Sequence, residues 1–310
     1  MSKGLINHKG IFYIYKLLDK YAHIILILPV LITMVILTQY PFFNILYLSF
    51  TKYNLLWDPH PTFNGLKNYF KALSDPILYS SIKVTSLIIA TSVPSEFIFG
   101  LLLAFLVDSF TKGRNFIRTL IIIPMVLPPI VSGIAWRLIL NPEYGPLNYF
   151  LNLFYKIGKI DWLGAPIPAI ISIILSDVWQ WTPFMFLVFY ASLQAFPSDL
   201  RDAAFVDGAS YFQMMIHVIL PELMPIMSMA LLLRLIDSLK IFDTVYMLTY
   251  GGPGYTTHVL SFYIYKVAFK YMEMGYASCL ALLLLFLDLF LVYILIRLLR
   301  VGKILGLEEG

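Results

Sequence analysis

The chain has 310 residues, with 22 Lys and Arg against 18 Asp and Glu, and charged residues make up 13% of it. Soluble domains carry about 25% charged and about 45–50% apolar residues, whereas hydrophobic residues reach 60% here and the mean hydropathy is +0.81. This composition excludes a water-soluble globular domain and a disordered chain. The lone Cys279 excludes an internal disulfide framework, and no basic run with interleaved aromatic residues points to nucleic acid. We therefore expect an integral membrane protein that binds no nucleic acid.

Six apolar stretches are each long enough to cross a bilayer, which takes about 20 mostly apolar residues. They cover residues 24–50, 82–107, 116–140, 167–193, 219–239 and 275–297. The sequence thus predicts an all-α polytopic membrane protein with six transmembrane helices. We expect residues 1–23, which hold four lysines, to be a cytoplasmic leader before an uncleaved first span. Residues 301–310 are expected to be a cytoplasmic tail.

An even number of spans places both termini on one side of the membrane, and we expect that side to be the cytoplasm. In this orientation eleven Lys and Arg residues lie inside and eight outside, in agreement with the positive-inside rule. Residues 24–81 would form the first transmembrane helix and an external loop, and residues 82–300 the transmembrane core. The connection at 194–218 would then face the cytoplasm, and that at 240–274 the outside of the cell membrane.

The inside connection contains the pattern of a short surface helix at about residues 198–208. Ser198 is a fair N-cap, and Asp199 and Asp202 suit the positive end of the helix dipole. Gly208 is a natural stop for the helix. Small side chains in this stretch would let another protein surface approach closely. On these residues alone, an interfacial helix that only closes the loop is an equal alternative.

The spacing of this connection resembles the EAA loop of binding-protein-dependent ABC importer permeases. The resemblance is carried by Asp202, Ala203, Ala204, Gly208, Leu220 and Pro221. Asp202 stands for the usual Glu, and Val218 for the usual Ile. In that family the loop holds a coupling helix that docks on a cytoplasmic ATPase subunit. The resemblance therefore implies an ATPase-coupling role for these six residues.

Other stretches resemble carbohydrate-type permeases of the maltose/trehalose and glycerol-3-phosphate class. They cover residues 63–69, 242–249 running into 251–254, and 260–269 with 275–278. The likeness extends over about residues 25–300 and implies a type I importer core of five helices plus an N-terminal helix. It also implies the partners, which are a sister permease subunit, an ATP-binding cassette ATPase dimer, an external solute-binding protein and a sugar.

Sequence motifs of catalysis are missing from the chain. It has no G-x-x-x-x-G-K-[ST], so energy for transport must come from a partner or from an ion gradient. The five histidines form no H-E-x-x-H, and no G-x-S-x-G occurs, which disfavours a membrane-embedded enzyme. We expect a non-catalytic subunit with no metal and no cofactor of its own, and with ATP bound by the partner subunit.

Charged side chains in the predicted spans are expected to have a structural or functional role, because a charge at mid-bilayer costs about 2.5–3.5 kcal/mol on insertion scales. Candidate sugar contacts on the two spans that flank the inside connection are Asp177, Gln180, Trp181, Phe184, Arg234, Asp237 and Ser238. Aromatic rings stack on the C–H faces of a sugar, and polar side chains bind its hydroxyls. The resemblance favours this role, since related sugar permeases place substrate contacts on these spans. The structural alternative pairs Arg234 with Asp237 and satisfies Asp177 from a neighbouring helix.

Three further charged residues lie in the predicted spans, namely Glu96, Arg137 and Asp288. For Glu96, an inter-helix hydrogen bond is favoured over transport chemistry. An ion-coupled secondary carrier for a small polar solute could use Glu96, Asp177 or Asp288 as proton sites, but it leaves the motif at 197–221 unexplained. We therefore expect a permease subunit that carries a sugar by alternating access, with the particular sugar undetermined.

Overall fold

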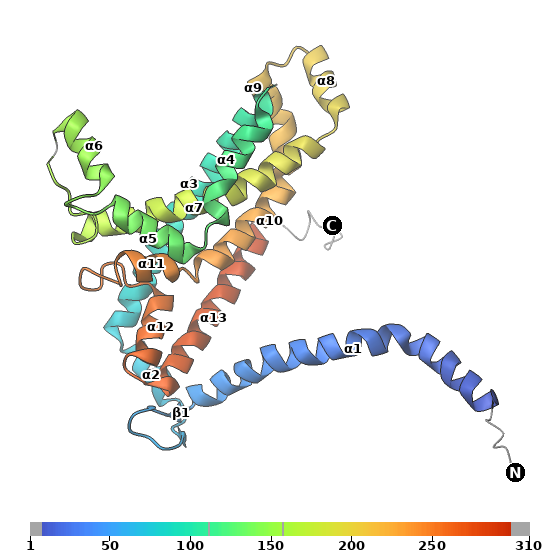
Figure 1. Cartoon of the computed structure of the whole chain (residues 1–310), viewed down its shortest axis with the longest axis vertical. Coiled ribbons are helices and arrows are strands. Elements are labelled where there is room, and N and C mark those ends of the chain that lie inside the picture. The colour runs from blue at the N-terminus through green and yellow to red at the C-terminus, as the bar shows by residue number, and fades with distance from the viewer. Residues whose placement is uncertain (1–7, 111, 157, 299–310) are drawn as a thin grey trace, which may run out of the picture.

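The computed structural model describes residues 8–110, 112–156 and 158–298 (Figure 1). Most of these residues are helical, and two short antiparallel strands, β1 (Thr51–Lys52) and β2 (Thr62–Phe63), pair in the loop after the first helix. The helices are α1 (His8–Ser49), α2 (Lys67–Leu73), α3 (Pro76–Ser109), α4 (Arg114–Val126), α5 (Pro129–Ile139), α6 (Pro146–Tyr155), α7 (Pro166–Ala195), α8 (Ser198–Val206), α9 (Tyr211–Met214), the π-helix η1 (Met215–Ile219), α10 (Leu220–Ser238), α11 (Asp243–Leu248), α12 (Leu260–Phe269) and α13 (Met274–Leu298).

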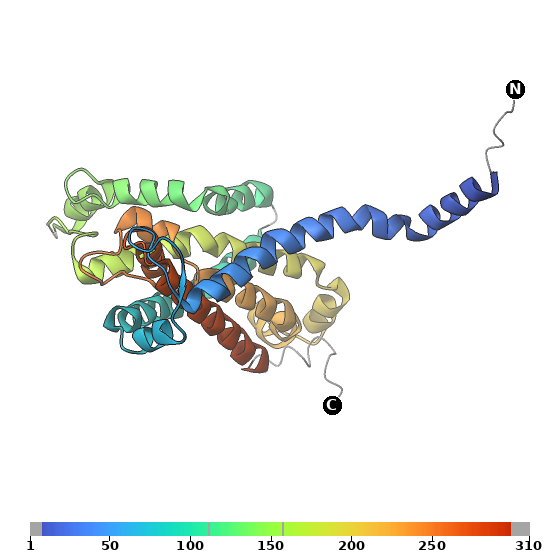
Figure 2. The same cartoon turned by 90° about the horizontal axis from the view of Figure 1, so that it is seen from below.

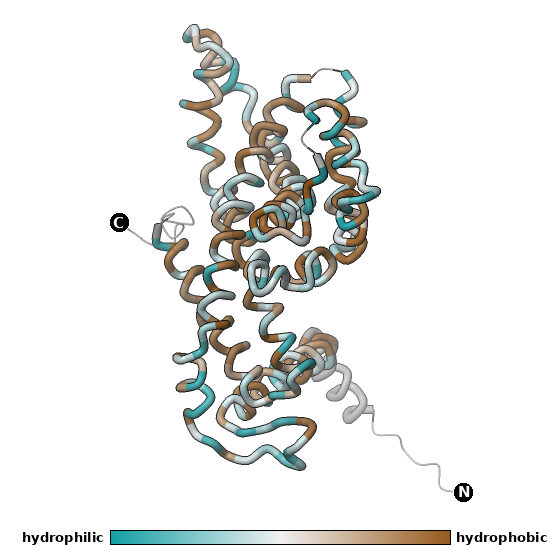
Figure 3. The backbone as a smooth tube through the Cα atoms, turned by 90° about the vertical axis from the view of Figure 1, so that its left-hand side faces the viewer, coloured by the Kyte–Doolittle hydropathy of each residue, from teal (hydrophilic) through white to brown (hydrophobic). Residues whose placement is uncertain are grey.

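Five helical segments in the described residues are long and apolar enough to cross a membrane. They are Leu26–Ser49, Pro76–Ser109, Pro166–Ala195, Tyr211–Ser238 and Met274–Arg297. Each of them contains most or all of one predicted span, and Figure 3 shows hydrophobic residues running along these helices, with hydrophilic residues gathered in the connections. The all-α membrane fold that hydropathy predicts is confirmed.

The single helix predicted over residues 116–140 is corrected to a bent pair. α4 and α5 meet at an angle of 96°, and the chain has up to six spans when this pair is counted as one. Leu127 and Pro128 are extended between the two helices, with ψ of 134° and 137°. A proline disfavours the helical conformation in the residue before it. The tandem Pro128 and Pro129 therefore break the helix at two successive residues.

The core lies where α3, α7 and α10 meet. Its buried side chains include Val93 of α3, Phe186 of α7 and Met227 of α10. Gly100 allows α3 to approach α7 closely, because a Cβ at this position would lie 2.5 Å from the Cβ of Met185 and 2.9 Å from the amide nitrogen of Phe186. Any side chain at position 100 would push the two helices apart.

At the end of the bundle near β1, the carboxylate of Asp75 accepts hydrogen bonds from three helices, α3, α12 and α13. It caps α3 by accepting from the backbone N–H groups of Ile77 and Leu78, at 2.9 and 3.3 Å. The hydroxyls of Tyr263 on α12 and Tyr276 on α13 both donate to its Oδ2 at 2.5 Å. Burial alone would raise the pKa of Asp75, but these hydrogen bonds outweigh it and leave the pKa below its ordinary value.

The first helix stands apart from the bundle. In Figures 1 and 2, α1 extends away from the other helices and meets them only towards its C-terminal end, where it contacts α13 and β1. None of the residues in the most apolar stretch of Leu26–Ser49 is buried within the chain. Lipid or another protein chain must therefore cover this helix.

Candidate functional site

A polar cavity of about 100 Å³ lies between α7 and the end of α10. Its walls come from Pro129, Asp177, Trp181, Arg234, Asp237, Ser238 and residues 240–244. Five of the seven residues predicted to contact a sugar are therefore brought together here. Ligand pockets usually enclose about 300–1,000 Å³, so this cavity is smaller than a typical ligand pocket.

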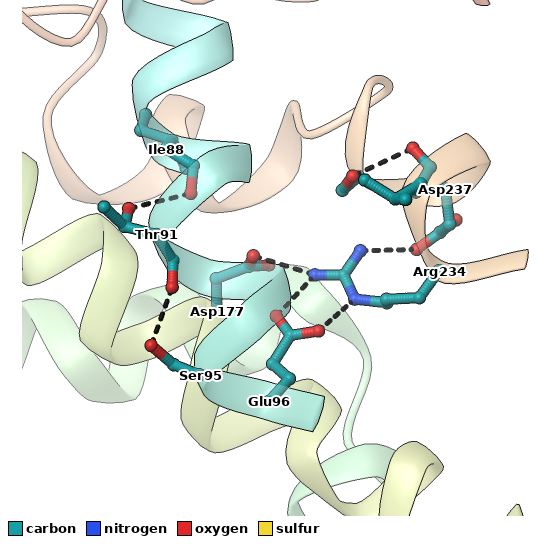
Figure 4. A network of polar contacts seen from close by, with 9 residues as sticks. Ile88, Thr91, Ser95, Glu96, Asp177, Arg234 and Asp237 are labelled. Carbon is teal, nitrogen blue, oxygen red and sulfur yellow. Dashed lines mark hydrogen bonds and ion pairs between the residues drawn. The ribbon is translucent and has the colours of Figure 1, made fainter. Parts of the chain in front are cut away.

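The guanidinium of Arg234 holds the cavity wall together (Figure 4). Its Nε and Nη2 lie 2.6 and 2.9 Å from the two carboxylate oxygens of Glu96, and Nη2 also lies 2.8 Å from Oδ2 of Asp177. The third nitrogen, Nη1, is 3.4 Å from Oδ2 of Asp237. A guanidinium fork matches a carboxylate in this two-bond geometry. Arg234 of α10 thus joins α3 and α7 through two separate carboxylates.

These groups differ sharply in exposure. The side chains of Arg234, Glu96 and Asp177 are 2%, 0% and 4% exposed, whereas that of Asp237 is 55% exposed. The Trp181 ring also packs on the guanidinium, with its centroid 5.1 Å from the Arg234 Cζ. The guanidinium of Arg234 is therefore held by the buried Glu96 and Asp177, and Asp237 is its one exposed carboxylate partner among the described residues.

Arg234 and its three carboxylate partners, which we term the arginine cluster, contain more acidic than basic groups. The three carboxylates belong to Glu96, Asp177 and Asp237. Lys240 and Asp243, which also line the cavity, add one charge of each sign. No group of three or more His, Cys, Asp or Glu side chains in residues 8–110, 112–156 and 158–298 could hold a metal ion. The cavity can therefore offer hydrogen bonds and ring faces to a ligand, but no surplus of positive charge.

Gln180 and Phe184 lie outside the cavity, although they share a helix face with Asp177. Gln180 is 2% exposed, and its amide donates to the carbonyl oxygen of Leu127 at 3.1 Å. That carbonyl belongs to the break between α4 and α5, which lies within the stretch that hydropathy predicts as a single helix. Phe184 packs against the core. Both residues are predicted sugar contacts, whereas the contacts they make in the structure are internal to the protein.

The structure also identifies residues that the sequence analysis did not assign to the site. The chain after α10 folds back so that Phe242, Asp243 and Thr244 line the cavity. The available signal was their position in the stretch that resembles carbohydrate permeases. The inter-helix hydrogen bond expected for Glu96 is confirmed by its contact with Arg234.

The two other charged residues in the predicted spans lie away from the cavity. Arg137 of α5 donates from Nη1 to the carbonyl oxygen of Met247 on α11, at 3.2 Å. Asp288 lies on α13, and its Oδ1 is buried without a hydrogen-bond partner in the described part of the chain. Neither residue contributes to the arginine cluster.

The predicted coupling helix is present as α8, at the far end of the bundle from β1 and α2 (Figure 1). Its N-cap is Pro197, with no side-chain cap, so the capping role expected for Ser198 is wrong. Ser198 is instead the first helical residue, and its hydroxyl lies 3.4 Å from Oδ1 of Asp199. Gly208 ends the turn with a φ of +80°, and no described atom lies within 4 Å of where its Cβ would stand.

The six predicted coupling residues divide into two groups. Asp202, Ala203, Gly208 and Pro221 are exposed, whereas Ala204 is buried and Leu220 packs against the core. Exposed apolar side chains accompany the first group on α8, with Leu200 at 47%, Phe205 at 51% and Val206 at 87%. α8 thus carries exposed apolar side chains around much of its surface, and nothing in the described chain covers them.

Arg201 links α8 to the nearby ends of α3 and α7. Its Nη1 lies 3.0 Å from Oδ2 of Asp108, and its Nη2 lies 2.6 Å from the carbonyl oxygen of Leu193. The amide of Gln194 donates to the other oxygen of Asp108 at 2.7 Å. This link is not predictable from the sequence, because Asp108 lies 93 residues before Arg201.

Comparison with known proteins identifies the family. Residues 96–300 match the family described as "Binding-protein-dependent transport system inner membrane component". The chain is 38% identical to the trehalose/maltose transport system permease protein MalF of Thermococcus litoralis over 251 residues, which cover 81% of this chain and 83% of the relative. It is 34% identical to the trehalose transport system permease protein SugA of Mycobacterium tuberculosis over 270 residues, which cover 87% and 85%.

A solved structure has the same fold. A chain in the crystal structure of a bacterial ABC transporter involved in the import of the acidic polysaccharide alginate aligns with a TM-score of 0.81. The alignment covers 93% of this chain and 98% of that one, at 21% sequence identity. These matches support a permease over an ion-coupled carrier. The chain belongs to the family of inner-membrane components of binding-protein-dependent transport systems, and it is a membrane-embedded transport permease.

Proposed function

We propose that this chain is the permease subunit of an ATP-driven importer and forms part of the path of a sugar by alternating access. One observation carries the proposal: a single helical framework, α7 to α10, bears the polar cavity near one end and the exposed face of α8 at the other. The chain itself is non-catalytic, and ATP is bound by the partner subunit. The trehalose and maltose systems named for its relatives support a sugar as the substrate.

The chemistry of the cavity fits a neutral sugar. Trp181 and Phe242 provide ring faces, and Asp237, Ser238 and Thr244 provide hydrogen-bonding groups for hydroxyls. Arg234 is already neutralised by buried carboxylates. An anionic sugar would meet the surplus of acidic groups, so the cavity favours an uncharged one.

The exposed face of α8 is the docking surface for the ATPase in this proposal. Leu200, Phe205 and Val206 offer apolar area, and Gly208 leaves open space beside them. Arg201 then passes a displacement of α8 to the ends of α3 and α7. Since α8 faces the ATPase, the loops at 51–81 and 240–274 face an external solute-binding protein, and both termini are cytoplasmic.

A sister permease subunit completes the path. The cavity of about 100 Å³ is too small for a ligand pocket, and α1 exposes its most apolar stretch. A second six-span chain would supply the missing wall of the path, and with lipid it would cover the apolar surface of α1.

The first experiment is to purify the chain from its own membranes in mild detergent and to identify co-purifying chains by mass spectrometry. An ATPase with a P-loop and a second six-span chain are expected. The complex, reconstituted in vesicles with its solute-binding protein, should take up radiolabelled maltose or trehalose only when ATP is supplied. Uptake driven by a proton gradient without ATP would overturn the proposal in favour of the secondary carrier.

Gly208→Asp tests the docking surface in the same vesicles. We expect a loss of uptake of about tenfold or more, with the complex still in the membrane, because an Asp side chain occupies the open approach to α8 and strains a positive φ. Gly113→Asp is the matched control, since Gly113 has a φ of +76° and equally open surroundings but precedes α4. Equal uptake by the two variants would contradict the coupling role.

A further inference from the structure

Five aromatic side chains form a continuous row on α11, α12 and the adjoining turns, which we term the aromatic ladder. Its members are Phe242, Tyr246, Tyr250, Tyr265 and Phe269. Ring centroids are 5.4 Å apart for Phe242 and Tyr246, and 5.2 Å apart for Tyr246 and Tyr250. Tyr265 lies 5.2 Å from Phe242 and 5.6 Å from both Tyr246 and Phe269. Each ring of the ladder is thus in contact with the next.

The ladder begins at the polar cavity, because Phe242 lines it. From there it follows α12, which runs from beside α11 towards α2 at the end of the bundle that carries β1 (Figure 1). Neither α11 nor α12 is long enough to be a membrane span. The ladder therefore leads from the cavity towards the face of the protein that the proposed orientation places outside the membrane.

The ladder is more exposed than the core beneath it. Phe262 is fully buried and lies 5.3 to 6.3 Å from Phe242, Tyr246, Tyr250 and Tyr265. Above it, Tyr250 and Phe269 at the two outer ends are 42% and 58% exposed, and the other three rings are half-buried. The rings of the ladder thus rest on Phe262 and leave part of their own surface uncovered.

Polar groups accompany the ring faces. Three of the five rings are tyrosines, and their hydroxyls interact with one another and with Lys270. A hydrogen bond with the Tyr246 hydroxyl raises the pKa of Tyr265, and one with the Tyr250 hydroxyl raises the pKa of Lys270. Ring faces with a few hydroxyl and ammonium groups beside them suit a ligand that has both C–H faces and hydroxyls.

We propose that the aromatic ladder is an entry subsite for a neutral saccharide, which stacks on its rings while it passes from the outer face to the polar cavity. The inference rests on the proposed function as a sugar importer. A saccharide is the occupant because the row is continuous with the cavity, and because a saccharide presents apolar C–H faces to rings and hydroxyls to the tyrosines. A row that served only as an interfacial anchor would have no reason to reach the cavity.

The test uses Tyr250→Leu, Phe269→Leu and the double variant in the reconstituted complex with its ATPase and solute-binding protein. Both positions are exposed, so leucine removes the flat ring without opening a hole in the core. The measured quantity is the amount of radiolabelled maltose or trehalose taken up per ATP hydrolysed. A sugar that is no longer held on the ladder escapes outward, so this ratio should fall by about two- to tenfold per ring.

Three comparisons make the result decisive. Tyr155→Leu, at a 71% exposed tyrosine on α6 away from the ladder, should leave the ratio unchanged. Tyr250→Phe, which keeps the aromatic ring, should retain most of the wild-type sugar-to-ATP ratio. The stimulation of ATP hydrolysis by the loaded solute-binding protein should stay at the wild-type level in every variant.

If the wild-type complex imports sugar, two results would overturn the proposed role of the ladder as an entry subsite without affecting the proposed function. The first is a double variant with the same sugar-to-ATP ratio as Tyr155→Leu, which would make the ladder an interfacial anchor. The second is a loss of ATPase stimulation, which would make it a docking surface for the solute-binding protein. A wild-type complex that hydrolyses ATP but takes up neither sugar would overturn the proposed substrate, and the ladder with it.

Discussion

Two arginines bridge the same pair of helices at opposite depths of the molecule. Arg234 binds Glu96 of α3 and Asp177 of α7 within the bundle, and Arg201 binds Asp108 of α3 and a carbonyl of α7 at the α8 end. The side chain of Arg234 is 2% exposed and all its nitrogens are paired. That of Arg201 is 24% exposed, its partner Asp108 is 6% exposed, and its Nε is buried without a hydrogen-bond partner among the described residues.

The difference shows how solvent access sets the role of an ion pair. Within the bundle, an unpaired charge has no water to stabilise it, so the bonds of Arg234 to the buried Glu96 and Asp177 stabilise the assembled helices. Near the aqueous end, water can replace a lost partner of Arg201, so its bonds can form and break during a transport cycle. We expect the inner arginine to stabilise the fold and the outer one to affect coupling.

The largest expected effect is that of Arg234→Met, which leaves two buried carboxylates unpaired. It should lower the stability of the subunit by about 3–5 kcal/mol, measured as earlier thermal aggregation of the purified complex in detergent. Combining it with Glu96→Gln and Asp177→Asn removes the unpaired charges and should recover much of the loss. A single variant as stable as the wild type would show that the inner cluster is not required for assembly.

An intermediate effect is expected for Arg201→Gln and Asp108→Asn. Each loses one charged partner at the end of α3, where the Asp108 side chain is 6% exposed and the Arg201 side chain 24% exposed, so stability should fall by about 1–3 kcal/mol. Uptake should decrease while the ATPase activity without sugar stays unchanged, because α8 can then move without α3.

The control for this pair is Arg114→Gln. Arg114 lies at the same end and donates to the carbonyl oxygens of Phe110 and Asp108, and its hydrogen bonds in the described residues do not reach α8. It should keep wild-type uptake. If all three variants transport equally well, Arg201 does not transmit the movement of α8.

The smallest change in stability is expected for Asp237→Asn. The Asp237 side chain is 55% exposed, and its 3.4 Å contact is the longest that Arg234 makes with a carboxylate. We expect a loss below about 1 kcal/mol. Asp237 faces the open side of the cavity, so its loss should weaken sugar binding. The sugar concentration for half-maximal uptake should rise about three- to tenfold, where tenfold corresponds to about 1.4 kcal/mol of lost hydrogen bonding. An unchanged half-maximal concentration would place the sugar contacts elsewhere.

Features that depend on neighbouring residues were predictable from the sequence. The long helices follow from runs of apolar residues, and α8 follows from a short pattern that ends at Gly208. The break after Val126 was only partly predictable, because single prolines elsewhere in the spans, such as Pro94 and Pro183, are accommodated within continuous helices. It takes the tandem Pro128–Pro129 to separate α4 from α5.

Features that depend on distant residues were not predictable. Glu96 and Arg234 lie 138 residues apart, and nothing in the sequence around either specifies the other as its partner. The position of Gln180 depends on the carbonyl that the α4–α5 break leaves free. Helical periodicity correctly grouped it with Asp177 on one face, but periodicity cannot say which neighbour that face meets.

The isolation of α1 has a consequence for biogenesis. A newly inserted subunit exposes the apolar stretch of Leu26–Ser49 and rests this helix on little more than α13 and β1. If a partner chain supplies part of its contacts, a subunit made in excess leaves the apolar surface of this helix available to membrane proteases. The cell could then remove unassembled copies of this subunit by proteolysis, without any dedicated regulator.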